Sequence, residues 1–216
     1  MDEPVGLRER KKRATRDAIA TAARHLFAER GFDVVTVAEV AAVADVSEKT
    51  VFNYFATKED LAFAGGEGPV NRLLDDMAGR QAGVPVLAVF RAATDAMLDG
   101  VAAAVSNDEI LEVTRIVRGS RTLPERLTMK WEREARALTE VIAKTTGADP
   151  DDVLPAVVAR ALWSTHRTIL GAAIDGLLSG EDPEALAGRL RPVAARAYDR
   201  LANGLGGYGA PSDDPR

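Results

Sequence analysis

The stretch TVAEVAAVADVSEKTVFNYFATKEDL, residues 36–61, decides the fold because it contains three helix starts in close succession. At the first start, Thr36 is followed three residues later by Glu39, which is the spacing of a capping box. Ser47 is a favourable N-cap for the second helix, and Thr57 is a favourable N-cap for the third. The spacing therefore predicts three short helices in which each start is stabilised by its own side chain.

The turn between the first two of these helices, residues 44–46, is tight. Its middle residue, Asp45, is one of the few non-glycine types that tolerate a left-handed backbone. Two short helices joined by such a turn predict a helix-turn-helix. In the second helix Val51 and Phe55 stand one turn apart and face the core, which leaves the polar residues on the other faces. The alternative is an ordinary helical hairpin whose polar face is only solvated.

The sequence around this stretch resembles a known family. The segments TRDAIATAARHLFAERGF, TVAEVA and ADVSEKTVFNYFATKEDL are similar to the DNA-binding head of the TetR family of bacterial transcriptional regulators. The wording SEKTVFNYF most resembles the branch that includes regulators associated with mycofactocin gene clusters and acyl-CoA-type ligands. Three positions depart from the family pattern: Phe52 replaces a common tyrosine, Ala56 a common proline and Asp45 a usual glycine. The missing tyrosine hydroxyl removes one expected phosphate contact.

The resemblance implies a set of DNA-binding residues in and beside the second helix. The residues expected to hold phosphates are Thr36, Thr50, Tyr54 and Lys58, and those expected to face bases are Ser47, Glu48, Lys49 and Asn53. The side chain of Asn53 can pair bidentately with adenine, and that of Lys49 can donate to guanine. Glu48 either excludes wrong bases or serves only the positive end of the helix.

The composition predicts an all-α protein. Of the 216 residues 46% are hydrophobic and only 5% aromatic, and apolar residues recur at spacings of three and four with no convincing alternating strand. The absence of cysteine excludes disulfides and thiolate metal sites. The charged N-terminus predicts no signal peptide, and no apolar run approaches the roughly 20 residues of a membrane span. We therefore expect a cytoplasmic protein with no membrane association, bound metal or cofactor.

The net charge of −5 argues at first sight against a nucleic-acid binder, but the charge is unevenly distributed. Near the N-terminus a single acid, Glu9, stands among six basic residues. These are Arg8, Arg10, Lys11, Lys12, Arg13 and Arg16. A small basic arm on an acidic body favours local phosphate binding over general binding of polyanions. The alternative is a solvated helix start.

Glycines interrupt the helical pattern after the helix-turn-helix. A fourth helix is expected to begin at Thr57 and to run to about Gly79, with Gly65, Gly66 and Gly68 inside it. The interruption predicts a domain boundary, because glycine destabilises helix interiors. We expect an arm and DNA-binding domain over residues 1–62, a helical ligand-binding and dimerisation domain over 63–203, and a disordered tail over 204–216, with about nine helices in all.

The two helices near the C-terminus carry more apolar surface than a small bundle readily hides. The segment 157–178 is apolar almost all round, which predicts burial on both sides. In TetR-like proteins the corresponding pair of helices forms a four-helix dimer interface, so the resemblance implies a homodimer. A two-fold dimer would present two recognition helices to a palindromic operator in double-stranded DNA. The alternative is that these helices form only the core of a monomer.

The resemblance also implies that the body responds to a small-molecule effector, apolar or acyl-CoA-like. The residues expected to line its site are Phe90, Thr94, Met97, Trp131 and Trp163, with Arg115 for an anionic group. Residues of these types more often serve only in core packing, and Arg115 is equally compatible with solvent exposure. Ligand binding would favour the conformation that releases DNA, which makes a repressor the expected mode of action.

Two other functional classes compete with this interpretation. An all-helical enzyme would need a catalytic constellation, but His25 and His166 are the only neutral-pH bases. Neither has a nucleophile or a metal partner at useful spacing. We therefore expect no enzymatic activity. A ligand-independent architectural DNA-binding protein would need no effector site, so a small molecule that binds or stabilises the chain would separate it from a regulator.

Overall fold

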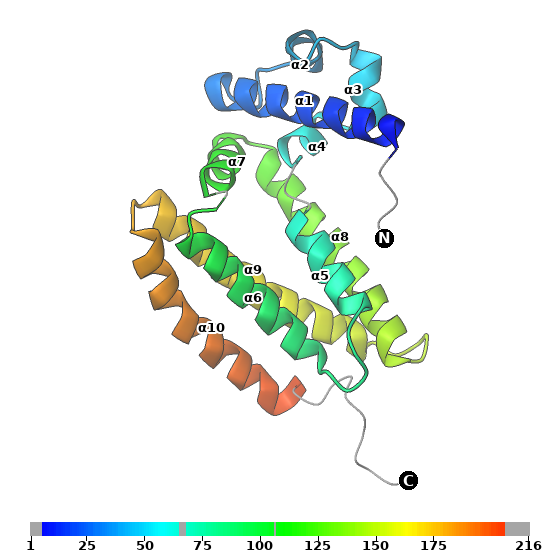
Figure 1. Cartoon of the computed structure of the whole chain (residues 1–216), viewed down its shortest axis with the longest axis vertical. Helices are drawn as coiled ribbons and strands as arrows, with labels where there is room; N and C mark the ends of the chain where they lie inside the picture. The colour runs from blue at the N-terminus through cyan, green and yellow to red at the C-terminus, as the bar shows by residue number, and fades with distance from the viewer. Residues whose placement is uncertain (1–5, 65–67, 106, 206–216) are drawn as a thin grey trace. The chain divides into compact units, whose positions relative to one another are not determined.

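The computed structural model describes residues 6–64, 68–105 and 107–205, and within these ranges the chain is helical without strands. The prediction of an all-α fold is confirmed. The helices are α1 (Leu7–Arg30), α2 (Val37–Val43), α3 (Glu48–Tyr54), α4 (Lys58–Ala62), α5 (Gly68–Ala78), α6 (Val86–Ala102), α7 (Asn107–Gly119), α8 (Leu123–Thr146), α9 (Leu154–Leu178) and α10 (Pro183–Leu205) (Figure 1).

The expected fourth helix is in fact two helices. α4 ends at Ala62 and α5 begins at Gly68, so the described residues contain ten helices where about nine were expected. Gly65 and Gly66, to which the interruption was attributed, lie outside the described residues. At the other end, α10 continues to Leu205, two residues into the expected tail, and residues 206–216 also lie outside the described part.

The chain forms two compact units. Unit 1 comprises Met1–Glu67 with Glu112–Thr128, and unit 2 comprises Gly68–Leu111 with Met129–Arg216. Unit 1 therefore combines the N-terminal helices with a later segment, which a contiguous division at residue 62 does not include. The division into functional domains stays a prediction, because compact packing does not by itself demonstrate independent function.

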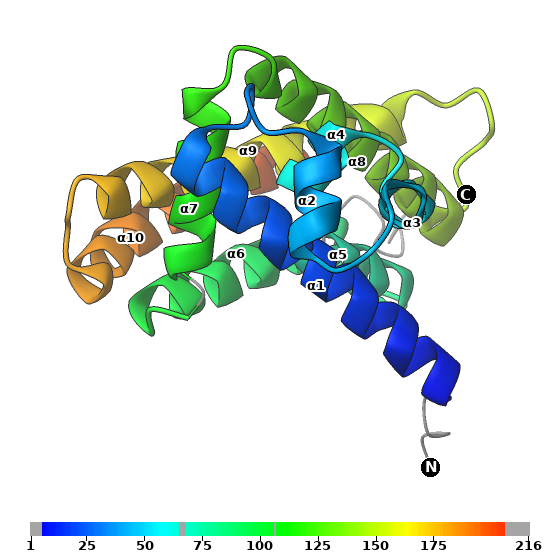
Figure 2. The ribbon, with the colours of Figure 1, turned by 90° about the horizontal axis from the view of Figure 1, so that it is seen from above.

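The core of unit 1 is built on the apolar stripe of α1. All five residues of this stripe are buried: Ile19, Ala22, Ala23, Leu26 and Phe27. Gly31 ends the helix with φ of 87°, a backbone conformation in which a Cβ would be strained. The following Phe32 packs edge-on against Phe27, with ring centroids 5.0 Å apart. The helix α2 packs against both α1 and α3, and α4 packs against α1 (Figure 2).

Residues 112–128 complete this core from the second half of α7 and the start of α8. Ile116, Val117 and Leu123 are buried in the same cluster as the α1 stripe. A polar contact fixes the turn between α7 and α8, because the Ser120 hydroxyl donates to a carboxylate oxygen of Asp33 at 2.8 Å. That hydrogen bond is the main reason why the pKa of Asp33 lies below its ordinary value.

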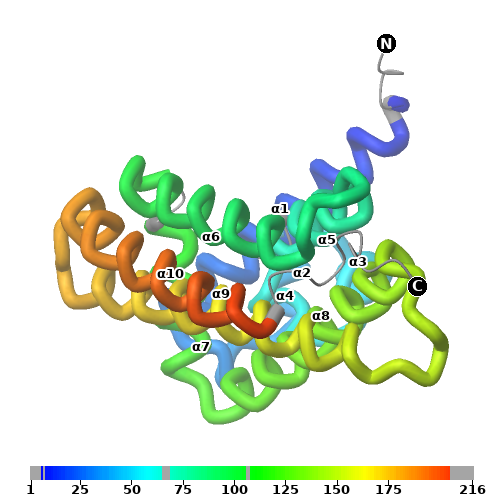
Figure 3. Tube along the Cα trace, turned by 90° about the horizontal axis from the view of Figure 1, so that it is seen from below, coloured from blue at the N-terminus to red at the C-terminus, as the bar shows by residue number. Residues whose placement is uncertain are grey.

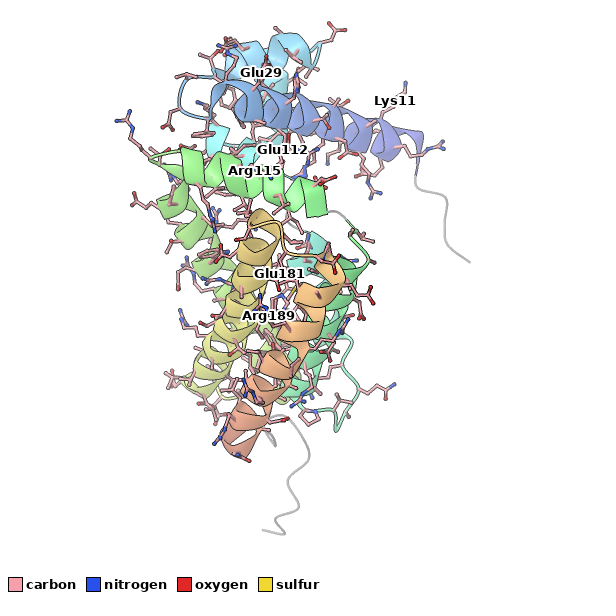
Figure 4. All side chains as sticks on the ribbon, turned by 90° about the vertical axis from the view of Figure 1, so that its left-hand side faces the viewer. Lys11, Glu29, Glu112, Arg115, Glu181 and Arg189 are labelled. Atoms are coloured by element: carbon pink, nitrogen blue, oxygen red, sulfur yellow. The ribbon has the colours of Figure 1, made fainter. Side chains whose placement is uncertain are left out.

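Unit 2 is organised around α6, α9 and α10, which pack against one another, while α5 packs on α6 (Figure 3). α9 and α10 meet closely at Gly176, where an added Cβ would lie 2.6 Å from a methyl carbon of Leu186. Beside this contact Glu181 accepts two hydrogen bonds from the Arg189 guanidinium, at 3.0 and 2.8 Å (Figure 4). A side chain at 176 would therefore force the Leu186 and Glu181 side chains to move.

Candidate functional site

The turn before α3 has the predicted left-handed backbone. Asp45 has φ of 53°, and the Val46 amide donates to the Ala41 carbonyl at 3.0 Å, which closes the turn. Ser47 then caps α3, because its hydroxyl oxygen accepts from the Thr50 amide at 3.1 Å. A tight turn and a capped helix fix the direction of α3 relative to α2, as a helix-turn-helix requires.

The faces of α3 are divided as the sequence predicts. Val51 and Phe55 are buried, while Glu48, Lys49 and Asn53 are exposed on the outer side of the helix. Lys49 and Asn53 stand four residues apart, so they lie one above the other on the outer face. The structure therefore presents a donor cation and a side-chain amide together, which are the two groups suited to reading base edges in a major groove.

Two of the residues expected to bind phosphates, Thr36 and Thr50, take part in helix capping. The Thr50 hydroxyl lies 2.8 Å from the Ser47 hydroxyl, within hydrogen-bonding distance. At the start of α2, the Glu39 carboxylate accepts from both the amide and the hydroxyl of Thr36, at 2.7 and 2.8 Å, and from Arg30 at 2.7 Å. These bonds, led by the one from the Thr36 amide, lower the pKa of Glu39 to about 2. Thr36 itself is exposed, so its position remains accessible to a phosphate.

Tyr54 and Lys58 face inward more than the sequence suggested. Tyr54 is half-buried and packs against the unit 1 core. The Lys58 ammonium donates to the Phe32 carbonyl at 2.5 Å and stands 4.3 Å from the centroid of the Phe32 ring. Burial lowers the pKa of Lys58. This arrangement gives Lys58 a packing role, and its contact with a phosphate stays a prediction.

Two features of the interface were not included among the expected site residues. Phe52 keeps 50% of its surface exposed on the outer side of α3, where an apolar ring could meet a thymine methyl or a sugar. The basic arm forms the first turns of α1, which extend past the other helices of unit 1 (Figure 2), and Lys11 projects from it (Figure 4). Basic side chains at the positive end of a helix oppose its dipole, and a bound phosphate would relieve that opposition.

The expected effector residues of the body lie mainly in a polar cluster within unit 2. The Thr94 hydroxyl donates to the Phe90 carbonyl at 2.9 Å and lies 2.8 Å from Nδ1 of His166 and 2.7 Å from the hydroxyl of Tyr198. One hydroxyl has a single proton and two lone pairs, so His166 Nδ1 and Tyr198 must both donate to Thr94. This assignment leaves Nε2 of His166 without a proton when the imidazole is neutral.

Burial decides the charge of this cluster. It lowers the pKa of His166 to about 4 and is the largest cause that raises the pKa of Tyr198 to about 12. His166 also stacks on Trp163, with ring centroids 5.5 Å apart and an interplanar angle of 13°. The three bonded side chains are therefore neutral near pH 7, and they join α6, α9 and α10 through groups that are far apart in the sequence.

The remaining expected effector residues divide between the two units. Met97 packs at the edge of the unit 2 core, and Trp131 is half-buried on α8. Arg115 is exposed on the part of α7 that belongs to unit 1, and its role in effector binding stays a prediction (Figure 4). Within unit 2, the guanidinium carbon of Arg167 stands 3.6 Å from the centroid of the Trp131 ring. Arg167 is one of two arginines on the apolar helix α9, and the sequence gives no signal that selects it.

Two kinds of structural feature are absent from the described ranges. Within them no helix is both long and apolar enough to cross a membrane. The same residues contain no group of three or more histidine and acidic side chains arranged to hold a metal ion.

Comparison with known proteins places these features in a family. Residues 19–64 match the sequence profile described as bacterial regulatory proteins, tetR family. The transcriptional regulator TcmR of Streptomyces glaucescens is 31% identical over 209 residues, covering 88% of this chain and 92% of TcmR. The transcriptional repressor Rv1474c of Mycobacterium tuberculosis is 30% identical over 184 residues, covering 81% of this chain and 88% of the repressor.

Solved structures show the same fold. NalD, the secondary repressor of the MexAB-OprM multidrug efflux pump in Pseudomonas aeruginosa, superposes with a TM-score of 0.54 at 20% identity, over 86% of this chain and 96% of NalD. SmeT, solved in complex with triclosan, gives a TM-score of 0.53 at 19% identity, over 94% of this chain and 100% of SmeT. The narrower resemblance to mycofactocin-associated regulators stays a prediction. The prediction of a DNA-binding transcriptional regulator is confirmed, and the chain belongs to the TetR family of bacterial regulatory proteins.

Proposed function

We propose that the chain is a repressor that binds a palindromic operator as a homodimer and releases it when a small-molecule effector binds unit 2. The observation that carries this proposal is the outer face of α3. Lys49 and Asn53 are exposed together there, on a helix whose start is fixed by the Ser47 cap and the Asp45 turn. Such a face reads bases in a major groove, while the basic start of α1 supplies affinity for phosphates.

The dimer is proposed from the outer surface of α9. Four small residues lie along it at spacings of three and four: Ala161 and Gly171 are partly exposed, and Ser164 and Thr168 are exposed. The Thr168 hydroxyl donates to the Ser164 carbonyl of its own helix at 2.8 Å, so it needs no further partner. A smooth helix surface with satisfied polar groups allows a second helix to approach closely. Thr168→Arg is expected to give a monomer by light scattering and to weaken operator binding.

The decisive experiment selects binding sites from random duplex DNA with the purified protein. We expect a short palindrome to be enriched, and each of Lys49→Ala and Asn53→Ala to weaken binding to it by about 1–3 kcal/mol, as expected for a lost base contact. Lys144→Ala and Asn203→Ala are matched controls, because both residues are exposed on helices of unit 2. These controls should bind the palindrome as the wild type does.

Two outcomes would count against the proposal. Folded protein that enriches no motif at low salt would exclude sequence-specific operator binding. Equal losses in the α3 variants and their controls would show that charge and folding, and not base contacts, decide the affinity.

A ligand-independent architectural DNA-binding protein is the second candidate. It would bind DNA without any small molecule that alters the affinity. The neutral cluster of Thr94, His166 and Tyr198 favours the regulator, because a body that served only as structure could use apolar residues at these buried positions. If no small molecule released the protein from the selected palindrome, the architectural alternative would be favoured.

A further inference from the structure

Two buried hydrogen-bond donors on α9 have no acceptor within the described part of the chain. They are Nε1 of Trp163 and Nε of Arg167, which stand four residues apart and thus on the same face of the helix. The Trp163 residue is only 7% exposed. Leaving a buried donor unsatisfied costs about 1–3 kcal/mol, so two such groups on one helical turn call for a partner.

Aromatic rings surround these two donors. The Arg167 guanidinium lies against Trp131 of α8 at 3.6 Å, and Trp163 is stacked on His166. The Arg167 guanidinium stacks on the Trp131 ring, and its Nε–H is shielded from water. A ligand that accepts hydrogen bonds here would therefore lie beside indole and imidazole rings, which favours an aromatic or flat apolar body.

The charges near Arg167 leave one positive charge in excess. Lys130 pairs with Glu134 along α8, and Arg160 pairs with Glu132 at 3.4 Å. Arg167 has no hydrogen bond to a carboxylate within the described residues. Burial lowers its pKa, and the Glu134 and Glu132 charges oppose that shift, so the guanidinium stays protonated. Three cations thus stand with two carboxylates.

The neighbouring polar groups add no charge to this balance. Nδ1 of His166 is committed to Thr94, and Tyr198 is bonded to the same hydroxyl. Burial keeps the imidazole neutral, so His166 adds no charge beside Arg167. The complement of a single cation with two N–H donors is a monoanion with two acceptor oxygens, such as a carboxylate.

We propose that the effector is an organic acid with an aromatic or flat apolar body, whose carboxylate accepts hydrogen bonds from Trp163 Nε1 and Arg167 Nε. This inference rests on the proposed function, since it names the class of molecule that would release DNA. It also moves the anion-binding role from Arg115, which the sequence suggested, to Arg167.

The chain contains two tryptophans, Trp131 and Trp163, so intrinsic tryptophan fluorescence reports on this site alone. The test titrates the full-length protein with phenylacetate and with phenylacetamide, which has the same body without the charge. We expect a saturable fluorescence change with phenylacetate and binding weaker by about tenfold or more with phenylacetamide, as for loss of a charge-assisted pair.

Variants locate the binding. Arg167→Met should weaken phenylacetate binding by about tenfold or more, because it removes the charge and the donor and keeps an apolar stem. Arg196→Met is the control, since it makes the same change at an exposed arginine of α10 in the same unit, outside the charges counted around Arg167. It should bind as the wild type does. Trp163→Phe removes the donor and keeps an aromatic ring, with Trp131 left as the reporter, and should also weaken binding.

Three outcomes would overturn the inference: no saturable change with phenylacetate, equal binding of the acid and the amide, or equal losses in Arg167→Met and Arg196→Met. A crystal structure with only water at Trp163 Nε1 and Arg167 Nε in the presence of phenylacetate would do the same. In each case the protein is first checked for binding to the selected palindrome. Retained DNA binding would separate failure of this inference from failure of the proposed function.

Discussion

Unit 1 and unit 2 place their polar groups in opposite ways. In unit 1 the candidate DNA-binding side chains lie outside, on α1 and α3, and the starts of α2, α3 and α4 are each capped by a side chain that accepts from an amide three positions further on. In unit 2 a polar cluster lies inside, where Thr94 meets His166 and Tyr198 across separations of 72 and 104 residues. The comparison teaches that an exposed helix face can be positioned by local signals, whereas a buried polar cluster requires long-range packing.

The largest expected effect tests whether the two units are separate in stability. Phe27→Ala removes the ring that packs on Phe32 in the unit 1 core and should destabilise that core by about 3–5 kcal/mol. Both tryptophans belong to unit 2, so fluorescence follows unit 2 while circular dichroism follows all helices. We expect denaturant unfolding of Phe27→Ala to shift a circular dichroism transition and leave the fluorescence midpoint nearly unchanged.

Phe90→Ala provides the matched control, because Phe90 is fully buried in the unit 2 core. It should move the fluorescence midpoint. If Phe27→Ala shifted both signals equally, the two units would unfold as one cooperative body and the contrast between them would not extend to stability.

The second effect concerns pH and should occur only in unit 2. An unfolded histidine has a pKa near 6.5, whereas burial holds His166 at about 4. On acidification the unfolded chain therefore binds a proton that the folded chain does not, and stability falls as pH drops through this window. The expected loss is about 2 kcal/mol between about pH 7 and about pH 5. Denaturant unfolding followed by tryptophan fluorescence measures it.

His166→Gln should remove most of this pH dependence, because an amide can donate to Thr94 without titrating in this range. His25→Gln replaces the other histidine, which is exposed in unit 1, and should leave the pH dependence intact. An unchanged pH dependence in His166→Gln would show that other groups in unit 2 are responsible.

The smallest effect compares one helix cap from each unit. Thr57 accepts from the Asp60 amide at 3.2 Å at the start of α4, and Asp182 accepts from the Ala185 amide at 2.9 Å at the start of α10. Replacement of either by alanine should destabilise its own unit by about 1 kcal/mol. Thermal unfolding should shift in circular dichroism for Thr57→Ala and in fluorescence for Asp182→Ala. A larger effect at Asp182 would mean that this cap also orders the contact between α9 and α10.

The accuracy of the sequence-based predictions follows the same division. The caps at Thr36, Ser47 and Thr57 and the left-handed Asp45 were predicted correctly, because each depends on neighbours within one helical turn. The sequence also predicted that glycines interrupt the helical pattern after α4, but it did not tell where the first helix stops and the second begins. Val51 and Phe55 were predicted correctly to face the core, while Phe52 keeps half of its surface exposed.

The sequence by itself determined the all-α fold, the helix-turn-helix and the outward face of α3, because these depend on periodicity, capping and turn chemistry over a few residues. Only the tertiary structure decided that residues 112–128 complete the core of unit 1. It also decided that Arg167 stacks on Trp131. Those contacts join residues distant in the chain, and which buried donor lacks an acceptor depends on every helix packed around it.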